Sequence, residues 1–133
     1  MAATLKVVQP PGPNPDNILF DQACNTNVAI GDIVRIDSGT VEKAQGNTYD
    51  NSLVLGICVD KPDTDVCDVM ITGPTEDTFT GLDAGKLYYL SATVAGELVD
   101  TPPTGSGEYV IRLGKAYSTT GLIIQIERVA KRS

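Results

Sequence analysis

The feature of this sequence that most constrains its fold is the length of its apolar runs. From residue 18 onward, short runs rich in Val, Ile, Leu and Tyr alternate with clusters of Gly, Asn, Asp, Ser, Thr and Pro. Such punctuation is typical of strands joined by tight turns. No window of about 11 residues keeps a helical period without a turn cluster inside it. We therefore expect an all-β domain, with strand-length runs at residues 30–37, 40–44, 52–59, 66–72, 86–92, 97–100, 109–117 and 122–129.

Two stretches of the chain repeat one pattern of glycines and apolar runs. Each begins with a glycine and a charged residue before a strand-length run, at Gly31 and at Gly85. Each continues through a short run to a Leu-Gly pair, at Gly56 and at Gly114, and ends in another apolar run. A glycine inside a strand marks a bulge or a close approach of backbones. We expect two similar four-stranded units forming a compact antiparallel β-barrel or barrel-like sandwich; the alternative is a chance match between generic strands.

The first 17 residues differ in composition from the rest of the chain. Four of its eight prolines fall within residues 10–15. Proline fixes φ and removes an amide donor, so this stretch is neither helix nor central strand. The sequence predicts an extended Pro-rich N-terminal arm at 1–17 before a β-barrel domain at 18–133, with a plain linker or loose terminus as the alternative. The candidate contact residues of the arm are Leu5, Val7, Val8, Pro10, Pro11, Pro13 and Pro15.

Composition excludes several kinds of chemistry. The chain has no His, which excludes a His-based catalytic triad and any His metal ligand. Its formal charge of -7 opposes binding to nucleic acid and to anionic membrane surfaces. No apolar run approaches the roughly 18 residues that cross a bilayer. The sequence therefore predicts no catalytic residues, no enzyme activity, no cofactor, and neither nucleic acid nor membrane as a partner.

Cysteines and carboxylates are the remaining candidate ligands for a metal. The three cysteines include no Cys-x-x-Cys pair, so we interpret them as small buried thiols of a protein made in a reducing cytoplasm. The densest acidic cluster contains Asp63, Asp65 and Asp68, without the glycine and final glutamate of an EF-hand loop. We expect a polar turn there and no metal site; a Ca²⁺ site is the alternative.

Tyr88 and Tyr89 are the aromatic residues with a candidate role at the surface. Neighbouring residues of a strand point to opposite faces of the sheet. We therefore expect one ring in the core and the other at the surface. Because tyrosine is enriched in protein interfaces, both are candidate interface residues, and an ordinary half-buried position is the alternative.

The repeated stretches resemble a known family. Residues 31–44 and 54–57 are similar to segments of small β-rich virion proteins of tailed bacteriophages, and the second half is more similar still. The resemblance covers roughly residues 27–127 and is strongest to capsid decoration, or cement, proteins. Its motifs are structural and carry no catalytic residues. They read Gly85…Tyr88-Tyr89-Leu90-Ser91…Gly96-Glu97-Leu98…Pro102-Pro103…Leu113-Gly114-Lys115-Ala116.

This resemblance implies a structural virion protein on the outer surface of a phage capsid. Its partner would be the major capsid protein, it would stabilise the shell, and it would form a homotrimer after synthesis in the host cytoplasm. One alternative is a phage tail or fibre module that binds a host-surface carbohydrate. Another is a small ligand-binding barrel or enzyme. The single compact domain favours decoration, because a fibre protein normally continues into long repetitive shafts.

Overall fold

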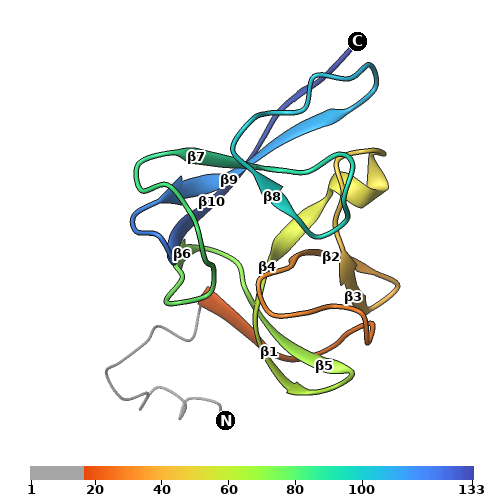
Figure 1. Cartoon of the computed structure of the whole chain (residues 1–133). Helices are drawn as coiled ribbons and strands as arrows, with labels where there is room; N and C mark the ends of the chain where they lie inside the picture. Colours follow the sequence, from red (N-terminus) through yellow and green to blue (C-terminus); the bar gives the residue numbers. More distant parts are fainter. Residues whose placement is uncertain (1–16) are drawn as a thin grey trace, which may run out of the picture.

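The computed structural model of the chain describes residues 17–133, which form two five-stranded antiparallel sheets (Figure 1). The first sheet contains β1 (Ile18–Ala23), β2 (Ile33–Asp37), β3 (Thr40–Lys43), β4 (Val54–Asp63) and β5 (Val66–Met70). The second contains β6 (Gly73–Pro74), β7 (Leu87–Leu90), β8 (Leu98–Val99), β9 (Tyr109–Ala116) and β10 (Leu122–Lys131). A 3-10 helix, η3 (Asp50–Ser52), precedes β4. No helix within residues 17–133 is long and apolar enough to cross a membrane.

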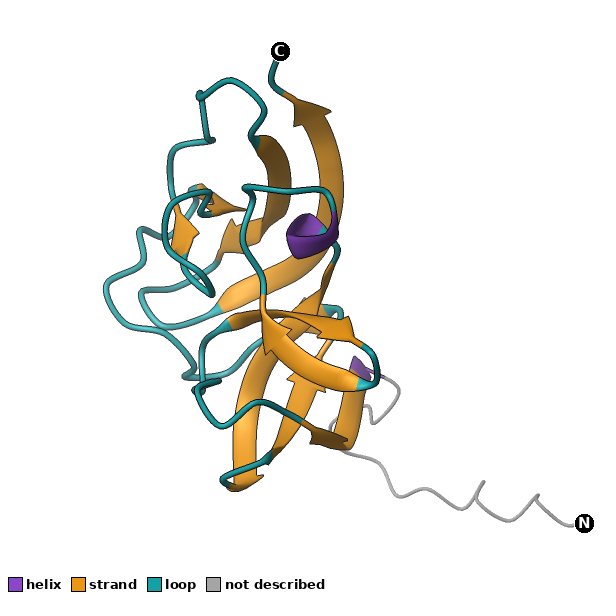
Figure 2. Cartoon of the chain, turned by 90° about the vertical axis from the view of Figure 1, so that its right-hand side faces the viewer, coloured by secondary structure: helices purple, strands orange, loops and turns teal. Residues whose placement is uncertain are grey.

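The all-β prediction is confirmed, and each of the eight expected runs contains a strand. The sequence analysis missed β1 and β6, so each sheet has five strands rather than four. The sheets do not close into one barrel; they stack one above the other (Figure 2). The edge strands β6 and β8 are two residues long, which is too short for a continuous ladder. In β6, Pro74 has no amide to donate to a further strand.

The two sheets share one strand order. Their strands follow β1-β5-β4-β2-β3 and β6-β10-β9-β7-β8. Val34 of β2 pairs with Gly56 of β4, and Tyr88 of β7 pairs with Gly114 of β9. In both sheets the register then shifts at the next residue of β2 or β7. The glycines that the sequence analysis aligned therefore lie opposite the same kind of irregularity.

Backbone hydrogen bonds at the start of β2 and β7 also correspond. The amide of Gly31 donates to the carbonyl of Cys58 at 2.7 Å, and that of Gly85 donates to the carbonyl of Ala116 at 2.7 Å. Both glycines have positive φ, at 95° and 94°, a conformation that disfavours other residues. Each sheet thus begins its repeated segment with the same glycine turn.

Corresponding side chains of β2 and β7 differ in burial. Ile33 and Leu90 are buried, whereas Leu87 and Ile36 are exposed. The difference follows from packing, because Ile33 contributes to the core that is centred on the second sheet. The backbone register is therefore repeated, but the burial of side chains is not.

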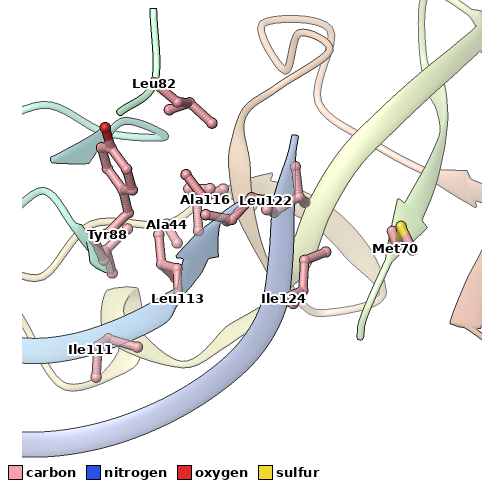
Figure 3. Packing of buried hydrophobic residues seen from close by; sticks show 12 residues of the cluster. Ala44, Met70, Leu82, Tyr88, Ile111, Leu113, Ala116, Leu122 and Ile124 are labelled. Carbon is pink, nitrogen blue, oxygen red and sulfur yellow. The ribbon is translucent and has the colours of Figure 1, made fainter. Parts of the chain in front are cut away.

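The apolar interior consists of two clusters. The larger one joins both sheets (Figure 3), and the hydroxyl of Tyr88 turns toward the Leu82 loop at its margin. The smaller cluster lies within the first sheet, where Cys24, the residue after β1, forms an isolated bridge with Val41 of β3. The larger cluster contains Ile33, Ala44, Ile57, Met70, Leu82, Tyr88, Leu90, Ile111, Leu113, Ala116, Leu122 and Ile124. The smaller contains Cys24, Val28, Val34, Val41, Cys58, Cys67 and Val69.

Candidate binding surfaces

The candidate arm residues, from Leu5 to Pro15, lie outside the described residues. The described chain begins at Asn17, whose carbonyl accepts the amide of Ile71 at 2.8 Å. The strand that follows, β1, is one of the two outer strands of the first sheet. Any segment that precedes Asn17 therefore joins the body of the protein at a sheet edge.

Of the two candidate interface tyrosines, only Tyr89 has surface to offer. Tyr88 is buried in the larger core cluster, and its hydroxyl accepts the amide of Asp83 at 2.8 Å. Tyr89 is half-buried on the same strand. A contact through Tyr88 would require the core to open, so any interface at β7 would use Tyr89.

Two carboxylates of the acidic cluster, at Asp63 in β4 and Asp68 in β5, accept backbone amides. One oxygen of Asp63 accepts the amide of Thr64 at 2.8 Å, and Asp68, which is buried, accepts the amide of Asp21 at 2.9 Å. Asp21 has a positive φ of 53°, so Asp68 stabilises a strained residue at the irregularity in β1. Within residues 17–133 no group of three or more acidic or cysteine side chains is arranged to hold a metal ion.

Chelation should leave the stability of the protein unchanged. We expect thermal unfolding curves recorded with and without EDTA to coincide, because Asp63 and Asp68 each accept a backbone amide and no set of three ligands comes together within residues 17–133. A ligand bound only by the folded state would raise the midpoint. A clear fall of the midpoint in EDTA would instead establish a cation site at this turn.

The three cysteines are buried, as the sequence analysis expected, and all three lie in the smaller core cluster. Cys24, Cys58 and Cys67 are free and buried, and they form part of one packed cluster, here called the thiol cluster. Burial raises the pKa of Cys58 to about 11. Burial, followed by the neighbouring thiols of Cys24 and Cys58, raises the pKa of Cys67 to about 12. Because the thiolate is the nucleophile, Cys58 and Cys67 are poorly reactive while the protein is folded.

The thiol cluster should make the protein less stable in alkali. In the unfolded chain the thiols of Cys58 and Cys67 have a pKa of 9.0, so they ionise at a lower pH there than they do in the folded protein. The contribution of Cys58 and Cys67 to stability is fully present below about pH 9 and is lost as the pH rises through 9 toward 11 for Cys58 and 12 for Cys67. By pH 11 the loss is roughly 2–3 kcal/mol for each of these two thiols. We expect urea unfolding to show this loss between about pH 9 and pH 11, and Cys58→Ala to reduce it by roughly half. An unchanged pH dependence in that variant would contradict this account.

Aromatic and basic side chains gather beside η3, where the sequence analysis expected nothing. The guanidinium of Arg128 lies 5.0 Å from the ring centre of Tyr49 and 5.3 Å from that of Tyr109. It also donates to the hydroxyl of Ser52 at 3.0 Å. Lys131 lies 5.6 Å from the ring centre of Tyr109. These residues form a partly exposed aromatic and cationic surface, the Tyr49 surface, at the far end of β10.

A hollow of about 500 Å³ lies where loops of the two sheets meet. A salt bridge between Lys43 and Asp32 spans 3.7 Å within it, and Asp32 also accepts the amide of Ala29 at 2.8 Å. Exposed Ile30 and Val94 contribute apolar walls. The lining residues are Ile30, Gly31, Asp32, Lys43, Thr78, Phe79, Thr80, Leu82, Val94, Ala95, Gly96, Glu97 and Leu98.

A second hollow of about 370 Å³ adjoins the first and shares Thr78 as a wall. The amide of Gly31, in the first hollow, bonds to the carbonyl of Cys58, which precedes Val59 in the second. Both hollows thus follow the boundary between the sheets, and together they are called the seam groove. The second is lined by Ile18, Val59, Met70, Pro74, Glu76, Asp77 and Thr78.

No protein-family model, curated protein or solved structure matches this chain. No relative therefore supplies contact residues, and the candidate contact surfaces follow from the geometry of this chain alone. The seam groove and the Tyr49 surface each combine residues from distant segments, and no local motif in the sequence marks either of them.

Proposed function

We propose that this protein is a phage capsid decoration protein that binds the outer face of the assembled shell and stabilises it. The observation that carries the proposal is the position of Asn17, which joins a preceding Pro-rich segment to β1, an outer strand of the first sheet. A segment attached there can reach a neighbouring subunit while the two sheets remain folded. The resemblance of residues 27–127 to small β-rich virion proteins adds support.

We further propose that the domain consists of two similar units derived from one β pattern. The shared strand order supports this, as do the matching pairs Val34–Gly56 and Tyr88–Gly114. A trimer that contacts the major capsid protein is the assembly that the resemblance implies. Many copies on one shell would raise the barrier to rupture even if each contact is modest.

The direct test is to mix the purified protein with undecorated phage capsids. We expect saturable co-sedimentation at a fixed number of copies per capsid and an increase in the temperature at which the shell ruptures. Electron cryomicroscopy of the decorated particles should place the protein on the outer surface. Binding to tails but not to heads would contradict the proposal.

A carbohydrate-binding tail or fibre module is the second candidate, and the Tyr49 surface favours it. Tyr49 is 56% exposed, and its ring packs edge-on against that of Tyr109, with an interplanar angle of 68° and ring centres 6.3 Å apart. Aromatic side chains with an apolar face and a polar tip suit surfaces that are partly wet. A glycan array separates the two candidates, because binding that is lost in Tyr49→Ala would support the carbohydrate module.

A further inference from the structure

The seam groove leaves large apolar side chains uncovered among the described residues. Ile30 is 53% exposed and Val94 is 49% exposed, and both line the same hollow. Single exposed apolar residues are ordinary. Where several of them share one concave surface, covering them with a ligand removes apolar area from water, which favours binding. The groove therefore has the character of a binding surface for an apolar segment.

The undescribed segment of the chain ends at this groove. Ile18, which directly follows Asn17, lines the second hollow, and Thr78 joins that hollow to the first. The carbonyl of Asn17 is bonded to Ile71, so the end of the segment is fixed beside the groove. Residues 1–16 are therefore attached at one end of the surface that they would cover.

Residues 5–8 have the chemistry that the groove requires. Three of them are apolar, and the fourth, Lys6, is the only charged residue among residues 1–15. In the groove, Asp32 is already paired with Lys43, which leaves an excess of negative charge. The carboxylates that line the two hollows are Asp32, Glu76, Asp77 and Glu97, against the single cation Lys43.

The segment is also long enough to reach the far hollow. A Pro-rich chain extends by about 3.1 Å per residue, so Val8 can lie about 28 Å from Asn17. A compact chain of this length has a radius of gyration of about 14 Å. Residues 5–8 can therefore lie anywhere along the groove without strain in the intervening prolines.

We propose that Leu5–Val8 bind in the seam groove of their own chain in the free protein. Leu5, Val7 and Val8 cover Ile30 and Val94, and Lys6 neutralises the carboxylates of the groove. The same apolar residues are the proposed capsid contact, so the groove controls their availability to the shell, a consequence that rests on the proposed function. The binding itself concerns the free protein alone.

Hydrogen–deuterium exchange of the free, full-length protein tests this inference without any capsid. We expect the amides of residues 2–9 to exchange at least about tenfold more slowly than those of a synthetic peptide of residues 1–16. Val94→Glu places a carboxylate in the groove and should return exchange to within about twofold of the peptide rate. Circular dichroism and the melting temperature establish that the variant is folded.

The matched control is Phe20→Glu. Phe20 is 52% exposed, and this exposed fraction is similar to the 49% of Val94. Phe20 lines neither hollow, so this variant should keep the slow exchange. Exchange at the peptide rate in the wild-type protein would overturn the inference, and so would slow exchange that persists in Val94→Glu. Protection that rises with protein concentration, together with a larger mass by light scattering, would overturn it in favour of arms shared between copies.

Discussion

Replacing Gly114 with alanine is expected to lower the free energy of unfolding by more than about 4 kcal/mol, which would leave little folded protein. A Cβ atom at this position would lie 1.9 Å from the carbonyl oxygen of Ile123, and its φ of 153° is one that side chains disfavour. Both backbones belong to the paired strands β9 and β10, so neither can move without disrupting the ladder. Gly56→Ala should be similarly severe, because its Cβ would lie 2.2 Å from the carbonyl oxygen of Met70.

The matched control for these substitutions is Gly39→Ala. Gly39 has a positive φ of 83°, but an added Cβ would meet nothing within 4 Å. Only backbone strain remains there, and it should cost about 1 kcal/mol. Urea unfolding of the three variants provides the comparison. If Gly114→Ala were no less stable than Gly39→Ala, the close approach of β9 and β10 would be wrong.

Gly56 and Gly114 also show what the sequence could predict about the fold. A glycine has no side chain to pack, so its position inside a strand-length run indicated a backbone contact. The structure places Met70 and Ile123 at that contact. The strand-length runs were equally readable, because turn residues separate them.

The number and closure of the strands could not be read in the same way. β1 carries Phe20 and Asp21 in the middle of its run, and β6 is Gly73–Pro74, so neither resembles a buried strand. Both become strands because a neighbouring strand, β5 or β10, offers them hydrogen bonds. Whether two sheets close into one barrel depends on such edge pairing, which a single strand's sequence does not encode.

Only features that are local in sequence led to predictions about the candidate site. The Pro-rich composition of residues 10–15 predicts an extended arm, and these residues lie outside the described part of the chain. The seam groove, by contrast, brings Ile30 beside Val94, and the Tyr49 surface brings Tyr49 beside Arg128. Their residues are separated by whole strands, so their proximity follows from the stacking of the sheets rather than from any spacing along the chain.

Deletion of residues 2–16 is expected to weaken binding to undecorated capsids by about 100-fold while the two sheets remain folded. The deletion keeps Asn17, whose carbonyl bonds to Ile71, and it removes no described strand. Leu5, Val7 and Val8 would each contribute roughly 1.5–3 kcal/mol when buried, before the cost of ordering the segment. A net loss of about 3 kcal/mol corresponds to that 100-fold change in the dissociation constant.

A triple substitution separates the apolar contacts of the arm from its charge and length. Replacing Leu5, Val7 and Val8 with Asp should weaken capsid binding nearly as much as the deletion, because three buried apolar groups are lost. The same charge change in Ala3→Asp, Thr4→Asp and Gln9→Asp keeps those groups and should weaken binding far less. Co-sedimentation with undecorated capsids measures all three proteins. If the deletion variant still decorates capsids with wild-type affinity, the arm is not the contact, and an exposed part of the folded body such as the Tyr49 surface must bind the shell instead.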